Sequence, residues 1–431
     1  MTISDLEEFP ASIGQRLLWV MERHRGANGA LNCPILLEMR GPVDTAALQA
    51  AVDRLVTLHE SLRTTFIRRD AQLRQVISPP QTADFAEIPL IGAGLTGPTL
   101  REAVLSELRA PIDVSVSPLR VRLFRLGANE RVLCINVHHL ATDAWSNGIL
   151  CRDLGREYEH LVHGTAPPSA PAWHYRQFVQ WQQEQLSSVR LERLQHYWRT
   201  SLQGVTFPIL PARSGSAPSH VGAYERILLQ PTLIQRLERI SRSCKATLFT
   251  AMLTLYFIMM EQRTGQADQA VVSIFANRPR PELQETVGFL ANPLILRTLL
   301  PSRASFRQLV GEVRRTALEA FVNQELPYQM LPFQSVTTAS ALDLVFQVFA
   351  SEVHQMVVSG VDIRAFPMPD GWGVRFDLDF SVIPEGNGMA VLVAYSVDRF
   401  GAAWVRTLLE DFTRLAHTAA EDPEAPLTGP G

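Results

Sequence analysis

The chain has 431 residues, of which 46% are hydrophobic and 19% are charged, so it can form a large core and does not have the composition of a disordered chain. This length allows two or three average domains, or two halves that share one architecture. The 40 basic and 43 acidic residues leave a formal net charge of −3, and no basic run is interleaved with aromatic residues, which excludes a nucleic-acid partner.

The spacing of the cysteines and the length of the apolar segments indicate in which cellular compartment the protein is found. No CxxC-type spacing joins the four cysteines, Cys33, Cys134, Cys151 and Cys244. They predict buried thiols of a reduced, cytoplasmic protein and no zinc site. The acidic N-terminus "MTISDLEEFP" lacks the apolar core of a signal peptide. The most apolar stretch, residues 246–260, is shorter than the roughly 18 to 20 residues that cross a bilayer, so we expect a buried helix and no membrane partner.

The first half of the chain predicts helices and a hairpin. Residues 45–66 place apolar side chains at helical spacing and run into an extended stretch at 63–67. Residues 118–126 and 131–139 are apolar pieces on either side of "GANE", which predicts a β-hairpin that leads up to two histidines. A second helical pattern begins at residue 144 and stops at Gly164, a C-terminal helix signal.

The second half repeats this mixture after a linker candidate, residues 164–173, which are rich in Pro, Ala and Ser. Helical patterns then alternate with strand patterns, the helices at 246–260, 305–321 and 401–422 and the strands at 270–277, 342–350, 375–383 and 389–397. The stretch "PEGNG", residues 384–388, predicts a hairpin turn between the last two strands. We therefore expect an α/β fold of two sandwich-like lobes, an N-terminal lobe over 1–170 and a C-terminal lobe over 171–431.

The stretch "HHLATDAW", residues 138–145, is the main candidate for chemistry. Neighbouring strand residues point to opposite faces, so His138 and His139 cannot both enter one cavity unless the strand has ended. A histidine that closes an apolar face is desolvated and stays neutral, and neutral imidazole is the form that accepts a proton as a general base. A core histidine with a hydrogen-bond partner is the alternative reading.

Asp143 has two readings of its own. It can cap the N-terminus of the next helix, or it can pair with an arginine and hold the loop that bears the histidines. A metal site would need further carboxylates or histidines nearby, and two adjacent histidines have the wrong geometry for one.

These residues and six further stretches resemble the condensation domains of nonribosomal peptide synthetases, whose signature is HHxxxDG. The further stretches follow the family's order: "SIGQRLLW" (12–19), "HESLRTTF" (59–66), "YRQFVQWQ" (175–182), "VGFLANPLILR" (287–297), "NQELPYQML" (323–331) and "YSVDRF" (395–400). The resemblance extends from about residue 10 to residue 426. A lone HHxxxD is weak evidence, whereas seven ordered matches are specific.

The resemblance implies a fold and an activity. The family has two lobes, each similar to chloramphenicol acetyltransferase, in a V-shaped pseudo-dimer with a tunnel between them. Its members join a donor acyl group to an acceptor amine, or to a hydroxyl, and form an amide or an ester in natural-product and antibiotic biosynthesis. Both substrates ride on phosphopantetheine arms of donor and acceptor peptidyl carrier proteins. The resemblance implies no cofactor or metal bound by the domain itself, which would be a monomer or part of a multidomain synthetase.

The family's roles carry over to matching residues. His139, the second histidine, would be catalytic, and His138 and Asp143 would support it. The partner of Asp143 would be Arg278, from "NRPRPE", or Arg63, from "LRTTF", with Arg278 slightly preferred.

Three further positions leave alternatives open. Ala144 stands where the family has glycine, and a Cβ there would cost on the order of 1 kcal/mol if the position needs a positive φ. Trp145 and Asn292 match residues that the family places near the tunnel, but core packing and loop capping would explain them as well.

Two other functions also stay open. "DGWG", residues 370–373, resembles a stretch of coenzyme A-dependent acyltransferases that share the HxxxDG site, although it also fits a simple turn. The other alternative is a noncatalytic carrier-protein docking domain, disabled by Ala144 or by loss of the family's later contacts.

Overall fold

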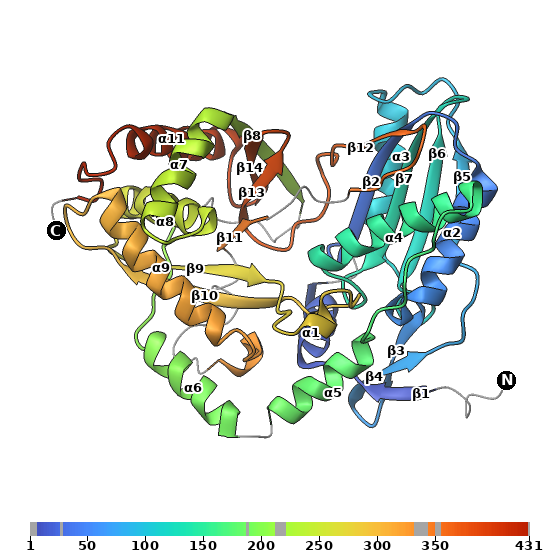
Figure 1. The fold of residues 1–431 in the computed structure, drawn as a ribbon, viewed down its shortest axis with the longest axis horizontal. Helices are drawn as coiled ribbons and strands as arrows, with labels where there is room; N and C mark the ends of the chain where they lie inside the picture. Colours follow the sequence, from blue (N-terminus) through green and yellow to red (C-terminus); the bar gives the residue numbers. More distant parts are fainter. Residues whose placement is uncertain are drawn as a thin grey trace. The chain divides into compact units, whose positions relative to one another are not determined.

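The computed structural model describes residues 7–25, 29–186, 189–211, 221–331, 344–349 and 355–429. Contacts divide the chain into two compact units, each with its own sheets and core (Figure 1). Unit 1 comprises Met1–Ser187, Ala276–Ala291 and Val353–Gly373. Unit 2 comprises Ser188–Phe275, Asn292–Glu352 and Val374–Gly431. The expected α/β class with two lobes is confirmed.

The main sheet of unit 1 has five strands in the order β12-β2-β7-β6-β5. Their bounds are β12 Asp362–Ala365, β2 Asn32–Arg40, β7 Glu130–His138, β6 Leu119–Arg125 and β5 Phe85–Pro89. Only the β5–β6 pair is parallel among these strands. The predicted hairpin is confirmed as β6 and β7, and β7 ends at His138. A smaller sheet holds β1 Glu7–Pro10, β4 Gln72–Ile77 and β3 Thr64–Arg69.

Helices cover both faces of the main sheet, because the side chains of β7 alternate between two apolar clusters. Leu133, Ile135 and Val137 pack with α2 (Thr45–Leu58) and α4 (Ala144–His163). Val132 and Cys134 pack with α3 (Pro98–Arg109) on the opposite face. The helix predicted after the histidines is thus α4, and its C-terminal Gly164 has the expected positive φ of 69°.

The remaining helices of unit 1 lie near its smaller sheet. They are α1 (Ile13–Arg25), the short 3₁₀ turn η2 (Glu60–Arg63) and α5 (Tyr175–Gln185). The helix predicted at 45–66 therefore ends at Leu58, and the chain passes through η2 before the extended stretch begins as β3.

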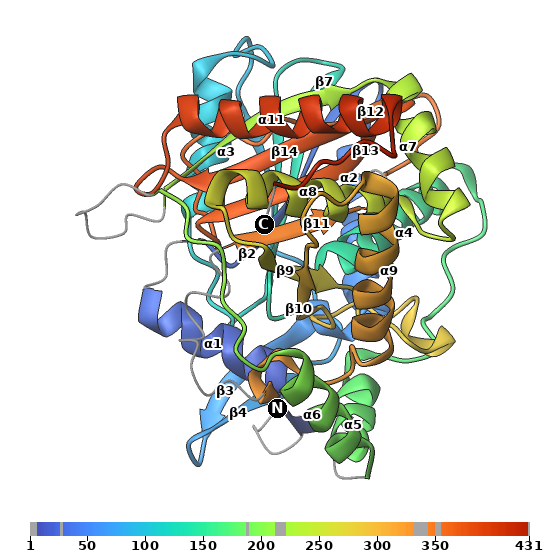
Figure 2. The ribbon, with the colours of Figure 1, turned by 90° about the vertical axis from the view of Figure 1, so that its left-hand side faces the viewer.

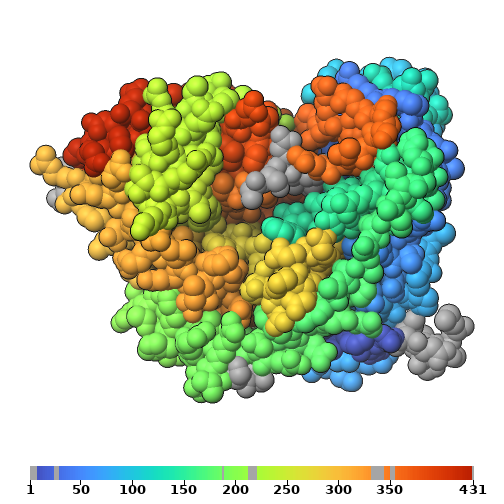
Figure 3. All heavy atoms as spheres, in the orientation of Figure 1, coloured from blue at the N-terminus to red at the C-terminus, as the bar shows by residue number. Residues whose placement is uncertain are grey.

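Two segments from late in the sequence return to unit 1. Strand β12 pairs with β2, which would otherwise be an edge strand, and gives its backbone groups a partner. Residues 276–291, which include η3 (Pro281–Leu283), lie against α4, as Figure 3 shows. The units thus differ from the expected ranges 1–170 and 171–431 at α5 and at these two segments. Contacts between residues distant in sequence create the difference, and local composition does not reveal such contacts.

Unit 2 is built on a six-stranded sheet in the order β10-β9-β11-β13-β14-β8. The strands are β10 Asn292–Leu299, β9 Asp268–Phe275, β11 Leu344–Val348, β13 Leu378–Glu385, β14 Gly388–Ser396 and β8 Gly222–Leu229. Strand β11 is parallel to both of its neighbours, and the other pairs are antiparallel. The predicted "PEGNG" hairpin is confirmed between β13 and β14.

Helices α7 (Pro231–Ser243), α8 (Leu248–Thr264), α9 (Phe306–Val322) and α11 (Ala402–Glu421) pack on this sheet (Figure 2). An aromatic cluster joins helix to sheet: the rings of Tyr256 and Phe346 lie 5.0 Å apart, and those of Phe380 and Phe412 lie 4.9 Å apart. Helix α6 (Val189–Ser201) and the short 3₁₀ turn η4 (Tyr328–Met330) also belong to this unit.

The apolar stretch at 246–260 is confirmed as a buried helix, because every residue of α8 from Thr250 to Met260 is buried. Within the described ranges, no single helix is long and apolar enough to span a membrane. Helices α7 and α8 reach that length and apolarity only together, and they meet at a bend of 102°.

Three of the four cysteines are buried, as predicted, and the fourth is partly exposed. Cys33, Cys134 and Cys151 are buried and unbridged, whereas Cys244 is half-buried. Burial raises the pKa of the Cys134 and Cys151 thiols well above its usual range, so both stay protonated and unreactive.

Candidate active site

The two histidines lie at the point where β7 ends. His138 is the last residue of the strand, and residues 139–141 form a turn in which the Ala141 amide donates to the His138 carbonyl at 2.8 Å. The backbone amide of His139 donates to the carbonyl of Leu31, also at 2.8 Å. Because the strand ends at His138, strand alternation no longer decides where the His139 ring points, and the contacts of each ring define its environment.

The ring of His139 has a defined tautomer. Its Nδ1 lies 2.8 Å from the carbonyl oxygen of Thr142. A carbonyl can only accept a hydrogen bond, so Nδ1 carries the proton and, in the neutral ring, Nε2 carries the lone pair. The edge of the ring also meets the aromatic ring of Phe289, with centroids 4.8 Å apart and planes at 68°. The hydrogen bond to Thr142 and the aromatic contact with Phe289 both orient the ring.

His138 is fully buried and bonded at both ring nitrogens. The backbone amide of Leu140 donates to its Nδ1 at 3.1 Å, and its Nε2 lies 3.1 Å from a carboxylate oxygen of Glu22. His138 is therefore a core histidine with satisfied polar groups, which is the alternative reading that the sequence left open for this pair.

Both readings of Asp143 are correct at once. Its Oδ1 accepts from the backbone amide of Ser146 at 2.8 Å and caps α4. The guanidinium of Arg278 contacts both carboxylate oxygens, at 3.1 and 3.2 Å, and this ion pair is buried. The backbone amides of Leu290 and Ala291 donate to Oδ2 at 3.0 and 3.1 Å. Asp143 thus joins the histidine loop, α4 and the segment 276–291.

Arg63, the other arginine considered, does not meet Asp143. Its Nη1 donates to the carbonyl of Ser78 at 2.6 Å, and its Nη2 lies 4.0 Å from Glu60. The two arginines could not be separated in the sequence, because the choice depends on which segment folds back onto α4.

Ala144 is the first residue of α4 and is exposed. It is absent from the described non-glycine residues with positive φ, so its Cβ causes no backbone strain. Alanine would strain this loop only if the position needed a positive φ, and Ala144 does not have one.

Trp145 and Ser146 link α4 to the segment 276–291. Trp145 is 45% exposed, which rules out the core-packing reading. Its indole nitrogen donates to the carbonyl of Gln284 at 2.9 Å, and its ring faces the guanidinium of Arg278 at 5.5 Å. The hydroxyl of Ser146 contacts both backbone polar groups of Gly288 and accepts from Arg278 at 2.9 Å.

Asn292 belongs to unit 2 and caps a loop there. Its amide nitrogen donates to the carbonyls of Gln324 and Leu326, at 2.7 and 2.8 Å. Its carbonyl oxygen accepts from the backbone amide of Tyr328 at 3.0 Å. These bonds agree with the loop-capping reading, and a role near a substrate tunnel stays a prediction.

Several residues that support the site were not identified in the sequence. They are Glu22, Thr142 and Phe289, described above, and Tyr175, whose buried hydroxyl donates to the carbonyl of Phe289 at 2.7 Å. Burial raises the pKa of the Tyr175 phenol well above its usual value, so it stays a neutral donor. Phe289 and Tyr175 lie within two of the stretches that resemble the family, 287–297 and 175–182. That position in a motif was the sequence signal that could have identified them.

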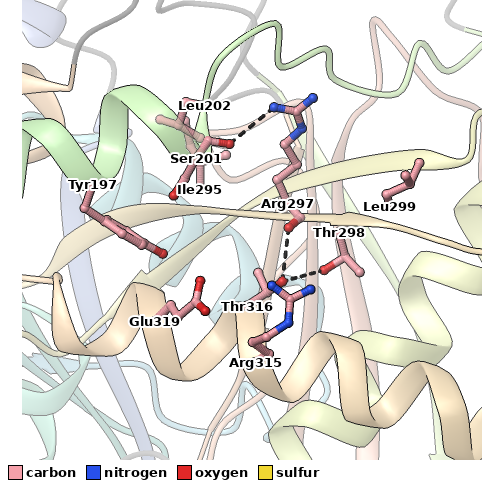
Figure 4. A pocket seen from close by; sticks show the side chains of 10 residues that line it. All are labelled: Tyr197, Ser201, Leu202, Ile295, Arg297, Thr298, Leu299, Arg315, Thr316 and Glu319. Atoms are coloured by element: carbon pink, nitrogen blue, oxygen red, sulfur yellow. Dashed lines mark hydrogen bonds between the residues drawn. The ribbon is translucent and has the colours of Figure 1, made fainter.

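Unit 2 has a pocket of about 200 Å³ at the edge strand β10 (Figure 4). Tyr197 and Ser201 of α6, Arg297 of β10 and Glu319 of α9 are among its lining residues. The guanidinium of Arg297 is held by Asp268 and by backbone carbonyls. No residue singled out in the sequence lines this pocket, so the pocket is separate from the candidate site.

The stretch "DGWG" forms a turn, as its simpler reading predicted. Asp370 and Gly371 occupy the turn, Gly371 has a φ of 90°, and its carbonyl accepts from the guanidinium of Arg109 at 2.7 and 3.0 Å.

Comparisons with known proteins agree with this arrangement. The profile of the Condensation domain family matches residues 6–429. The chain is 31% identical to the isonitrile lipopeptide synthase of Mycobacterium tuberculosis over 437 residues, which cover 96% of this chain and 17% of that protein. It is 28% identical to the cyclosporin synthetase simA of Tolypocladium inflatum over 432 residues, which cover 96% of this chain and 3% of that protein. The chain thus spans only a small part of the length of the curated relatives that it matches.

Solved structures share the fold. The SgcC5 protein from Streptomyces globisporus superimposes with a TM-score of 0.81 at 25% identity, covering 97% of this chain and 100% of that one. The X-domain from teicoplanin biosynthesis, solved in complex with OxyB, superimposes with a TM-score of 0.83 at 23% identity. The superposition covers 98% of this chain and 95% of the X-domain chain. Together with the ordered motifs and the buried Asp143–Arg278 pair, the family match establishes that this chain belongs to the condensation domains of nonribosomal peptide synthetases.

Proposed function

We propose that this chain is an active condensation domain. It transfers an acyl, aminoacyl or peptidyl group from a thioester on a donor carrier protein to the amine of an acceptor on a second carrier protein. The new bond is the amide C–N bond, the bond that breaks is the thioester C–S bond, and the donor phosphopantetheine leaves as a thiol. The family match over residues 6–429 supports this class of reaction.

The observation that carries the proposal is the hydrogen bond from Nδ1 of His139 to the Thr142 carbonyl, at 2.8 Å. It leaves the lone pair of the neutral ring on Nε2, which accepts the proton of the attacking amine. Asp143 acts on the loop and not on the ring, because its carboxylate bonds to Arg278, Ser146 and two backbone amides. His138 and Asp143 are therefore positioning residues.

The chemistry requires little else from the protein. A thioester carbonyl is already activated, so neither a covalent nucleophile nor a Lewis acid is needed. Holding two reactants in place lowers the barrier by roughly 7 to 11 kcal/mol in favourable cases, and one positioned proton acceptor adds about 10²- to 10⁴-fold. His139 supplies that proton acceptor.

Two observations weigh against the alternative functions. Ala144 is an exposed helix residue without positive φ, which removes one of the two sequence arguments for a disabled docking domain. The "DGWG" stretch is a turn, and the relatives include nonribosomal peptide synthetases, so coenzyme A is not favoured as the donor carrier.

The decisive experiment pairs the wild type with His139→Ala. Carrier proteins loaded with a panel of proteinogenic aminoacyl and short acyl groups are combined in donor–acceptor pairs, and the products are identified by mass spectrometry. We expect the wild type to form an amide product and His139→Ala to lose about 10²- to 10⁴-fold in rate. His163→Ala, an exposed histidine at the end of the same α4, is the matched control and should retain the wild-type rate.

Other outcomes would contradict the proposal in recognisable ways. Carrier binding without turnover, unchanged by His139→Ala, would identify a docking domain. Equal or faster turnover of acyl-coenzyme A without any donor carrier protein would identify a coenzyme A-dependent acyltransferase.

A further inference from the structure

Helix α1 contacts the histidine turn through two polar side chains. Gln15 and Glu22 are seven residues apart, about two helical turns, so they lie on the same face of α1. The amide nitrogen of Gln15 donates to the carbonyl of Leu140 at 2.9 Å. A carboxylate oxygen of Glu22 lies 3.1 Å from Nε2 of His138, and the Glu22 side chain is 22% exposed. Both contacts are within unit 1.

The contact with Glu22 assigns the protons of the His138 ring. The Leu140 amide can only donate, so the Nδ1 that it reaches at 3.1 Å carries no proton. The ring proton is therefore on Nε2 and points at the carboxylate of Glu22, which can only accept. In a ring with no exposed surface, the Glu22 carboxylate at Nε2 and the Leu140 amide at Nδ1 both favour the Nε2–H tautomer over the other one.

That tautomer in turn fixes the backbone next to His139. The peptide group between His139 and Leu140 is held by its amide on Nδ1 of His138, and the following carbonyl is held by Gln15. The amide of His139 is held separately by Leu31. Two of these three backbone anchors depend on α1. If His138 changed tautomer, Nδ1 would carry a hydrogen, and the Leu140 amide would lose its acceptor inside the core.

We propose that Glu22 is a positioning residue for acyl transfer: it sets the tautomer of His138, and through the Leu140 amide it orients His139. This inference rests on the proposed role of His139 as the proton acceptor. The contact of Glu22 is with the buried His138, and Glu22 acts on His139 through that histidine.

The kinetic test compares Glu22→Ala with Glu22→Gln, using the carrier-protein pair that gives product with the wild type. Glu22→Ala removes the acceptor, and we expect kcat to fall about 10- to 100-fold, the scale of a displacement of about 1 Å at a catalytic group, with KM little changed. Glu22→Gln keeps an acceptor oxygen and should stay close to the wild-type rate. Glu102→Ala, at an exposed glutamate of α3, is the matched control and should match the wild type.

A second measurement needs no substrate. Nitrogen-15 spectra of histidine-labelled protein distinguish protonated from unprotonated ring nitrogens, and the signals of His138 among the 11 histidines are assigned with His138→Asn. The wild type and Glu22→Gln should show a single tautomer with the proton on Nε2. Glu22→Ala should show a mixture of tautomers or the opposite tautomer.

Several results would overturn the inference. They are a wild-type kcat in Glu22→Ala, an unchanged His138 spectrum in that variant, or a Glu22→Gln protein as impaired as Glu22→Ala. A lower melting temperature with unchanged kcat would likewise reduce Glu22 to a stabilising residue. Failure of the proposed function itself is distinguishable, because His139→Ala would then keep the wild-type rate while the tautomer of His138 still responded to Glu22.

Discussion

Asp143 organises the candidate site at the scale of single residues. Its carboxylate receives the Arg278 guanidinium and the backbone amides of Ser146, Leu290 and Ala291. A buried ion pair is weak evidence for stability as such, since desolvation offsets much of the attraction. Here the pair connects three segments of unit 1 at the turn that carries His139, so its main effect is to define the geometry of that turn.

Removing one partner of this pair should be costly. Asp143→Asn replaces an accepting oxygen by an NH₂ group and leaves the Arg278 charge buried without its counter-ion. We expect the free energy of unfolding to fall by about 3 to 5 kcal/mol, measured by urea denaturation at pH 7. The control is Arg364→Ala on β12, whose ion pair with Asp362 is exposed and should contribute at most about 1 kcal/mol. Equal stability of Asp143→Asn and the wild type would refute this account.

At the scale of elements, the N-terminus of α4 packs closely against the segment 276–291. Gly288 of this segment also lies against Tyr175 of α5: a Cβ there would lie 2.0 Å from Cδ2 of the Tyr175 ring. Tyr175 is buried and cannot yield easily, because its hydroxyl holds the carbonyl of Phe289. Close approach, and not backbone conformation, therefore requires glycine at this position.

Two glycine-to-alanine changes should move stability in opposite directions. Gly288→Ala should lower the free energy of unfolding by about 1 to 3 kcal/mol through overpacking. Gly311→Ala, in the middle of α9 with open space around its Cβ, should raise it by about 0.5 to 1 kcal/mol, since alanine is the better helix former. Urea unfolding of both variants tests this, and a stabilised Gly288→Ala protein would mean that the Tyr175 contact is wrong.

At the scale of the whole molecule, buried charges make stability depend on pH. Asp153 lies in unit 1 with His59 Nε2 at 3.0 Å and the Arg152 guanidinium at 2.8 Å. Burial by itself would raise the pKa of the Asp153 carboxyl, but the hydrogen bonds and charges of His59 and Arg152 outweigh it and hold that pKa below its ordinary value. The ionised form therefore stabilises the fold above the unfolded-state pKa of about 3.9, and this contribution is lost as the pH falls through the lower folded-state pKa.

Asp153→Asn should show this dependence. At pH 7 the variant should be less stable than the wild type by roughly 1 to 3 kcal/mol, because His59 and Arg152 lose a buried charged acceptor. The difference should shrink as the pH is lowered below about 4, measured as urea midpoints across this range. Asp362→Asn, at an exposed aspartate, serves as the control and should follow the wild type at every pH. A gap that stays constant with pH would exclude a depressed pKa for Asp153.

Elements whose pattern is local could be predicted from the amino-acid sequence. The hairpin β6–β7, the helices α4, α8, α9 and α11 and the β13–β14 turn follow from side-chain periodicity and turn residues within a few positions. The capping role of Asp143 is local too, since Ser146 lies three residues away. The family resemblance, carried by short ordered motifs, was likewise available in the sequence and is confirmed by the match over residues 6–429.

Contacts between residues far apart in the chain could not be predicted and are seen in the folded protein. Arg278 and not Arg63 pairs with Asp143 across 135 positions, β12 joins the sheet of unit 1, and Phe289 reaches the ring of His139. Glu22 meets His138 across 116 positions. Periodicity specifies which face of an element is apolar, but the partner of a polar side chain depends on how separate segments pack, and that information is spread over the whole chain.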